Sequence, residues 1–191
     1  MERRTSAVDI EIRAADGDAQ PVIFGYAAVF DQLSEDLGGF RERIAPGAFT
    51  KALGDDVRAL FNHDPNIVLG RTRSKTLRIS EDQKGLVIEI DPPSTPAAAA
   101  LIESMRRGDV TQMSFGFQTV KDKWDMVDGE AIRTLIDVRL FDVSPVTYPA
   151  YPQTEVALRS LDEFRKLSET PAPPETGGLI RMKMLTLQAS V

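Results

Sequence analysis

The clearest strand signal in the chain is Gln112-Met113-Ser114-Phe115-Gly116-Phe117-Gln118-Thr119-Val120, in which large apolar residues alternate with small or polar ones. Successive side chains of a strand point to opposite faces, so the methionine and the two phenylalanines share one face, whereas Ser114 and Gly116 share the other. The apolar face predicts burial in a core. The small face predicts open space above the Ser114 hydroxyl, and Gly116 predicts that another chain can approach closely.

Further alternating segments predict a fold built mostly of strands. They cover residues 8–13, 22–30, 57–61, 76–80, 85–91 and 131–142, with polar turns near residues 81–84 and 128–129. Two short helices are expected, over residues 47–53 after Pro46 and over residues 96–107, where Ser94 or Thr95 is the N-cap and Gly108 the stop. This pattern predicts an α+β fold with a mainly antiparallel sheet or barrel, in preference to alternating βαβ units.

The composition is that of an ordinary globular protein. Its 191 residues, 42% hydrophobic and 27% charged, suffice for one domain with a buried core and a modest tail. The lack of cysteine excludes thiol catalysis, zinc ribbons, iron–sulfur clusters and disulfides. A net charge of −6 without a basic stripe argues against nucleic-acid binding. The sequence has no secretory signal and no apolar run near the ~20 residues that span a membrane, so a soluble intracellular protein is expected.

The chain divides into a folded body and a tail. Residues 1–159 are predicted to form one domain, because the strand and helix signals continue to about that point. A short helix over residues 158–167 and a Pro-, Thr- and Gly-rich flexible linker over residues 168–178 follow. In residues 179–191 apolar residues alternate with polar or charged ones, and the charged residues there are Arg181 and Lys183. Residues 160–191 are therefore predicted to be a short helix, a linker and a C-terminal tail.

His63 is the one histidine of the chain, and histidine is the side chain that ordinarily titrates near neutral pH. Because Pro65 disfavours helical geometry at Asp64, His63 is expected at a strand end or turn. One interpretation is a general base, and the other is a surface or hydrogen-bonded histidine at a turn. A metal site built on His63 and Asp64 would lack a second cluster of ligands.

Ser114 and Asp142 are two further candidates for chemistry. A serine held on a rigid strand is suited to nucleophilic attack, although an ordinary serine on a polar strand face has the same pattern. Asp142 is either part of the polar face of a strand or a carboxylate that orients a histidine, and Ser144 shares its face as a rival for either role. No G-x-S-x-G elbow is present, and chain order alone does not establish a triad.

Five groups of residues follow the order seen in one known family. They are Gly25-Tyr26-Ala27-Ala28-Val29-Phe30-Asp31, Glu42-Arg43-Ile44-Ala45-Pro46-Gly47-Ala48-Phe49, Phe61-Asn62-His63-Asp64-Pro65 with Val68-Leu69-Gly70-Arg71, Met113-Ser114-Phe115-Gly116-Phe117, and Leu140-Phe141-Asp142-Val143-Ser144-Pro145-Val146-Thr147-Tyr148-Pro149-Ala150-Tyr151-Pro152. Together they resemble the prohead (capsid-maturation) serine proteases of tailed phages. The resemblance covers residues 6–159 and does not extend to residues 160–191.

The resemblance implies a fold like that of the herpesvirus assemblins, a closed, mainly antiparallel β-barrel with a few packed helices. It also implies a serine endopeptidase in which Ser114 is the nucleophile, His63 the base and Asp142 the acid that orients the imidazole. Asp142 stands where many members of the family carry glutamate, and here the chain departs from the family's pattern. Arg71 is expected as a polar neighbour of this site, its alternative being a surface ion pair. No cofactor is implied.

The same resemblance implies cleavage of the scaffold-like segment of the major capsid protein, and self-cleavage, inside the immature capsid in the host cytoplasm. The expected partners are therefore the capsid protein and the chain itself, with no nucleic acid and no membrane; a homo-oligomer is consistent with the resemblance. Residues 160–191 are interpreted as a self-cleavage site or a docking peptide. The alternatives are a catalytically inactive capsid assembly or scaffolding module of the same fold, and a metal-dependent hydrolase.

Overall fold

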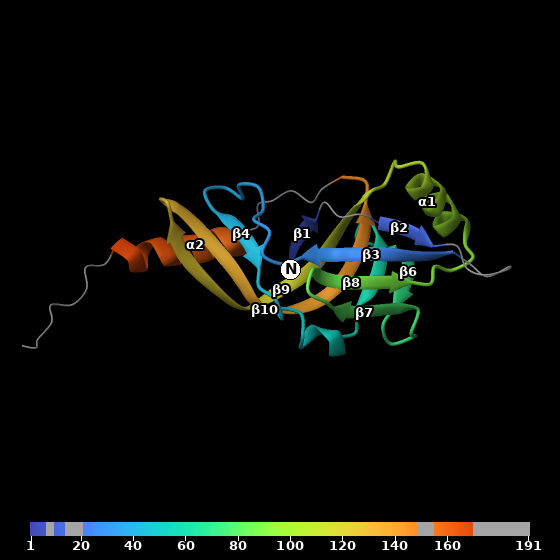
Figure 1. The fold of residues 1–191 in the computed structure, drawn as a ribbon, viewed down its shortest axis with the longest axis horizontal. Coiled ribbons are helices and arrows are strands. Elements are labelled where there is room, and N and C mark those ends of the chain that lie inside the picture. Colours follow the sequence, from blue (N-terminus) through green and yellow to red (C-terminus); the bar gives the residue numbers. More distant parts are fainter. Residues whose placement is uncertain (7–9, 14–20, 149–154, 170–191) are drawn as a thin grey trace, which may run out of the picture.

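The computed structural model describes residues 1–6, 10–13, 21–148 and 155–169 (Figure 1). Over these residues the chain forms, in order, β1 (Glu2–Ser6), β2 (Ile10–Arg13), β3 (Val22–Val29), β4 (Arg41–Ile44), the 3-10 helix η1 (Ala52–Gly54), β5 (Arg58–Phe61), β6 (Asp64–Arg71), β7 (Leu77–Glu81), β8 (Gly85–Ile90), α1 (Pro96–Arg106), β9 (Gln112–Val127), β10 (Glu130–Val146) and α2 (Glu155–Glu169). The predicted tail over residues 179–191, and most of the predicted linker, lie outside the described residues.

The described strands form two sheets. Sheet A has the order β1-β9-β10-β5-β6, and β4 pairs with another part of β10; sheet B has the order β2-β3-β8-β7. Strands β4 and β5 both run parallel to β10, whereas the other neighbouring strands are antiparallel. The prediction of a mostly antiparallel α+β fold is confirmed.

The prediction of a closed β-barrel is wrong, because among the described strands no ladder joins sheet A to sheet B. Large side chains lie between the sheets instead: Leu86 and Ile88 of sheet B share one buried cluster with Phe115 and Val143 of sheet A. Phe115 also meets Phe49 edge to face, with ring centroids 5.5 Å apart. Sheets separated by a layer of side chains lie about 10 Å apart, which backbone hydrogen bonds cannot span.

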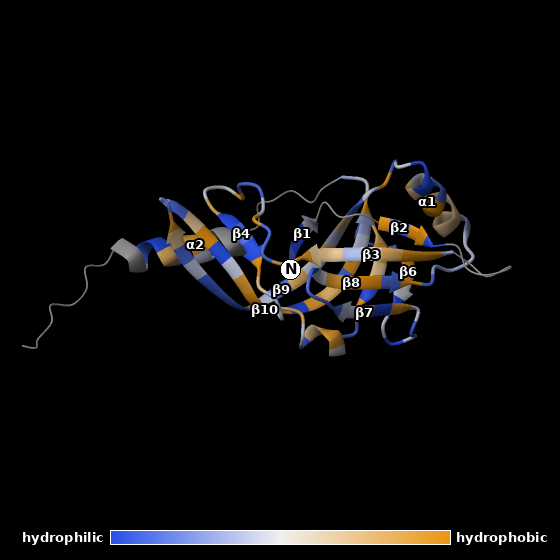
Figure 2. Ribbon diagram, viewed as in Figure 1, coloured by the Kyte–Doolittle hydropathy of each residue, from blue (hydrophilic) through white to orange (hydrophobic). Residues whose placement is uncertain are grey.

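The long β9–β10 hairpin organises sheet A. It turns at Asp128 and Gly129, whose φ angles of 52° and 83° are both positive, as a two-residue type I′ turn requires. The end of the hairpin that carries this turn gathers with β4 and α2 at one end of the molecule, whereas sheet B and α1 lie at the other (Figure 1). Figure 2 shows apolar and polar residues alternating along the hairpin, as expected for strands with one covered face.

Of the two predicted short helices, one is confirmed and the other is wrong. The helix expected over residues 96–107 is α1, and the Thr95 side chain caps it by accepting from the backbone N of Ala98 at 3.3 Å. The helix expected over residues 47–53 is instead a series of turns that ends in η1. Gly47 has a φ of 85°, which an α-helix cannot contain, and the N–H of Ala48 bonds back three residues to Ala45 O.

Helix α2 covers a small second cluster on the β9–β10 hairpin. Leu161 is buried there among Leu37, Phe40 and Ala131, and Trp124 donates from Nε1 to Ser160 Oγ at 2.9 Å. The predicted boundary between residues 159 and 160 falls inside this helix, and the division into two parts stays a prediction.

Candidate active site

His63 lies at the tip of the β5–β6 hairpin. Phe61 and Asp64 pair across a two-residue turn made of Asn62 and His63, whose φ angles are 53° and 57°. Both values fit a type I′ turn, as expected between two paired strands. Positive φ is unfavourable for residues other than glycine, so surrounding contacts must hold His63 in place. The prediction that His63 lies at a turn is confirmed.

Asn62 ties this turn to the end of β10. Its backbone N–H donates to Pro145 O at 3.0 Å. Its side chain donates from Nδ2 to Thr147 Oγ1 at 3.1 Å and accepts on Oδ1 from Thr147 N at 2.9 Å. Asn62 was not among the predicted site residues, although asparagine in a short turn directly before His63 is a signal, because asparagine tolerates positive φ well.

Ser114 and Asp142 come from the paired strands β9 and β10. In the register Ser114 lies opposite Ser144, and Gly116 lies opposite Asp142. Residues directly opposite each other share a face of the sheet, so all four positions face the same side. The β9–β10 register shifts between Leu140 and Asp142, so Phe141 is an extra residue of β10 without a partner on β9. A bulge of this kind changes the direction of the side chain beside it.

The structure joins the three predicted residues in one chain of hydrogen bonds. His63 Nε2 is 2.7 Å from Ser114 Oγ, and His63 Nδ1 is 2.5 Å from Asp142 Oδ1. An ionised carboxylate can only accept, so the imidazole carries its proton on Nδ1 and Nε2 accepts from the Ser114 hydroxyl. Ser114 is 0% exposed, Asp142 is 4% exposed, and the His63 side chain is 6% exposed.

Ser144 and Gly116 shape the surroundings of the Asp142 carboxylate. Ser144 is fully buried and donates from Oγ to Asp142 Oδ1 at 2.9 Å. A Cβ atom at Gly116 would overlap Asp142 Oδ2, so the glycine makes room for the carboxylate. The prediction of open space above the Ser114 hydroxyl is wrong, because Ser114 is fully buried. The prediction that another chain can approach closely at Gly116 is wrong as well, because the Asp142 side chain fills that space.

Arg71 lies two strands away from Asp142, since Arg58 on β5 pairs in register with both. Its guanidinium binds Asp56 through Nε to Oδ1 at 2.7 Å and Nη2 to Oδ2 at 2.5 Å. These bonds hold the pKa of Asp56 below its usual value. The contacts of Arg71 are thus those of a surface ion pair, the alternative that the sequence left open.

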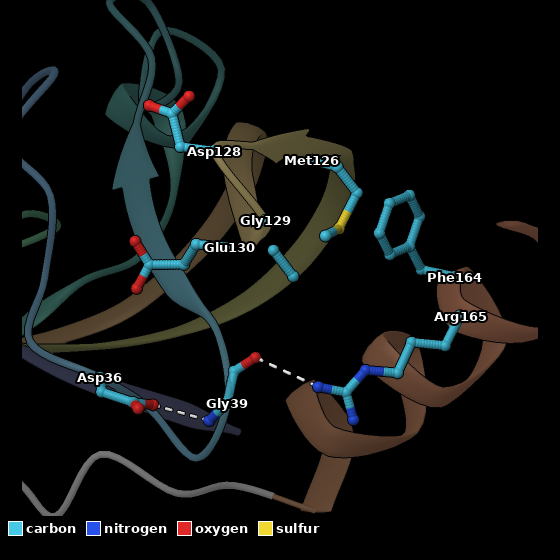
Figure 3. A pocket seen from close by; sticks show the side chains of 9 residues that line it. Asp36, Gly39, Met126, Asp128, Gly129, Glu130, Phe164 and Arg165 are labelled. Carbon is cyan, nitrogen blue, oxygen red and sulfur yellow. Dashed lines mark hydrogen bonds between the residues drawn. The ribbon is translucent and has the colours of Figure 1, made fainter.

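A separate pocket of ≈ 530 Å³ lies between α2 and the far end of the β9–β10 hairpin (Figure 3). Three acidic residues line this pocket together with one methionine, one phenylalanine and one arginine, and it shares no residue with the Ser114–His63–Asp142 chain. It is therefore distinct from the candidate active site. Its lining consists of Asp36, Gly39, Met126, Asp128, Gly129, Glu130, Ala131, Phe164 and Arg165.

The described part of the chain offers neither a metal site nor a membrane-spanning helix. No group of three or more histidine, aspartate and glutamate side chains is arranged to hold a metal ion. None of the helices there is long and apolar enough to cross a membrane.

A serine hydroxyl, an imidazole and a carboxylate linked by hydrogen bonds in this order form the arrangement of serine hydrolases. The comparison with protein families agrees with this class. The model of the caudovirus prohead serine proteases matches residues 8–167, and the chain belongs to this family. The resemblance seen in the sequence is thereby confirmed, and the chain is a serine protease of the capsid-maturation class.

Two individual proteins are similar to the chain. The prohead protease of Enterobacteria phage HK97 is 31% identical over 168 residues, which cover 84% of this chain and 70% of that protein. The structure of the bacteriophage T4 capsid assembly protease aligns with 78% of this chain and 100% of that one, at 11% identity and a TM-score of 0.45.

Proposed function

We propose that the chain is an endopeptidase that cleaves the scaffold-like segment of the major capsid protein, and itself, inside the immature capsid. The observation that carries this proposal is the buried hydrogen-bonded chain from Ser114 through His63 to Asp142. Membership of a family of prohead serine proteases supports both the reaction and its location. The capsid protein and the chain itself are the proposed substrates.

In the proposed mechanism, Ser114 Oγ attacks the carbonyl carbon of the scissile peptide bond while His63 Nε2 takes the hydroxyl proton. His63 then gives this proton to the leaving amine, and an acyl group remains on Ser114. Water, deprotonated in turn by His63, releases the acyl group. Asp142 holds the proton on Nδ1 throughout and stabilises the imidazolium that forms in each step.

The test is co-expression of the major capsid protein with the wild-type chain or with Ser114→Ala, followed by mass spectrometry of the particles. The wild-type chain should give discrete capsid-protein fragments, and Ser114→Ala should give none while it remains folded. His63→Ala should be equally inactive, whereas Asp142→Asn should retain a partial rate. Cleavage that persists in Ser114→Ala would remove the proposal. Assembled shells without cleavage in either case would favour a non-catalytic assembly module.

A further inference from the structure

Gln112, the first residue of β9, lies on the face of sheet A that carries the candidate active site. Ser114 follows it by two positions, and successive side chains of a strand point to opposite faces, so the two side chains share a face. In the register Gln112 lies opposite Val146, and Ser114 lies opposite Ser144. Met113, between them, belongs to the buried cluster on the other face. Gln112 is therefore a neighbour of the proposed nucleophile outside the apolar core.

The side-chain oxygen of Gln112 is buried without a hydrogen bond. No donor among the described residues binds its Oε1, although the residue as a whole is partly exposed. Two other side chains on this face are bonded. Ser114 Oγ lies 2.7 Å from His63 Nε2, and Ser144 Oγ donates to Asp142 Oδ1 at 2.9 Å. A buried acceptor without a donor lowers the stability of a fold, and most buried polar groups have partners. Oε1 of Gln112 is the exception beside the nucleophile.

A peptide substrate would bring a donor to this position. Two residues of a strand span about 7 Å, and an extended peptide advances by a similar length over two residues. A peptide whose scissile carbonyl lies at Ser114 Oγ can therefore place one of its next peptide groups at Gln112. Each peptide group carries one N–H donor and one C=O acceptor. The N–H is the kind of group that Oε1 lacks.

We infer that Gln112 is a substrate-binding residue of the peptidase. Its Oε1 accepts a hydrogen bond from a main-chain N–H of the substrate, within two residues of the scissile bond. This bond helps to hold the scissile carbonyl at Ser114 Oγ, and it selects an extended main chain without regard to the side chains. The inference rests on the proposed function of Ser114 as nucleophile, and its tests separate the two.

The first test asks whether Gln112 has a structural partner. Gln112→Met replaces the amide by an apolar group of similar length, so no hydrogen bond of the fold is lost and the free energy of unfolding should not fall. Gln118→Met, at an exposed position on the same strand, is the matched control. Denaturant unfolding compares both variants with the wild-type chain. A loss of stability in Gln112→Met alone would overturn the inference, because it would mean that the fold itself uses the amide.

The second test measures the hydrogen bond to the substrate. The substrate is a synthetic peptide that spans the capsid-protein cleavage site found by the co-expression experiment, and kcat/KM is measured with the full chain. In a series of analogues, an ester replaces one amide at a time within two residues of the scissile bond, which itself stays an amide. Each ester removes a single N–H. One of them should lower kcat/KM of the wild-type chain about tenfold, since a hydrogen bond contributes about that much.

Gln112→Met should cleave the all-amide peptide about tenfold more slowly than wild type. The same ester should cost this variant nothing further, because the acceptor for that N–H is already gone. Gln118→Met should keep the wild-type loss on ester substitution. Equal losses in Gln112→Met and wild type at every position would overturn the inference and leave the proposed function intact. Peptide cleavage that persists in Ser114→Ala, or a wild-type chain that cleaves no peptide, would instead contradict the proposed function, and the inference would fall with it.

Discussion

Gly116 matters through the space that it leaves to another side chain. The Asp142 carboxylate lies where a Cβ of residue 116 would be, and it accepts there from His63 and from Ser144. Ser144 Oγ and His63 Nδ1 bind the same oxygen, Oδ1, so the carboxylate is held by two donors at once. The orientation of the imidazole therefore depends on two residues, Gly116 and Ser144, that take no part in the chemistry themselves.

Gly116→Ala should reduce peptidase activity by about a hundredfold, because a displacement of about 1 Å in a catalytic group has an effect of that size. The added methyl group would push the Asp142 carboxylate away from His63. Gly54→Ala is the matched control, since a Cβ there meets no atom within 4 Å. Cleavage rates of the two variants, with thermal unfolding as a check of folding, decide the matter. Equal rates would show that Asp142 does not need this space.

At the scale of the element, the β5–β6 turn positions His63, and Asn62 contributes to that turn in two separate ways. It tolerates a positive φ of 53°, and its side chain forms two hydrogen bonds with Thr147. Asn62→Gly keeps the favourable φ but removes the side-chain bonds, whereas Asn62→Ala removes both. Both variants should lose activity. The free energy of unfolding of Asn62→Ala should in addition be about 1 kcal/mol lower than that of Asn62→Gly, because alanine does not favour a positive φ. Denaturant unfolding and peptide cleavage measured on both variants test this. Full activity of Asn62→Gly would mean that the side-chain bonds do not position His63.

Local patterns predicted the local elements. Alternation around Met113 predicted a core-facing strand, Pro65 predicted a strand end or turn at His63, and Ser94 or Thr95 predicted a helix cap. The contacts of Asn62 and Ser144 escaped prediction because they depend on how distant strands align with β10. The prediction of a closed β-barrel failed for a related reason. The alternation of apolar and polar residues specifies which face of a strand is buried, but it does not specify which strands share a ladder.

At the scale of the whole molecule, α2 should stabilise the end of the fold that is remote from Ser114. Leu161 is 2% exposed in the cluster with Phe40, so Leu161→Ala should lower the free energy of unfolding by about 2 to 5 kcal/mol. Glu163→Ala, an exposed position on the same helix, should leave the stability nearly unchanged. Denaturant unfolding of both variants provides the measurement. If the two had equal stabilities, packing of α2 on the hairpin would not contribute to the fold.

The buried charges that bind β1 join three strands, β1, β4 and β10, and should make the whole molecule sensitive to acid. Burial alone would raise the pKa of Glu2, but hydrogen bonds from Arg133 and Thr119, with the nearby arginine charges, outweigh it and hold the pKa below its ordinary value of 4.5. The unfolded chain therefore binds a proton at higher pH than the folded chain does. This contribution to stability is present above pH 4.5 and is lost as the pH falls through the folded pKa.

Glu2→Gln removes this titration and the negative charge that accepts from Arg133 and Arg4. It should therefore cost about 1 to 3 kcal/mol at neutral pH and flatten the loss of stability in acid. Glu103→Gln, on the exposed face of α1, is the matched control and should keep the wild-type pH dependence. Unfolding by denaturant, measured from about pH 3 to pH 7, compares the three proteins. Parallel curves for Glu2→Gln and wild type would show that the Glu2 carboxylate does not link β1 to the fold. A flattened curve would mean that protonation of Glu2 in acid weakens its bonds to Arg133 and Thr119 and so lowers the stability of the fold.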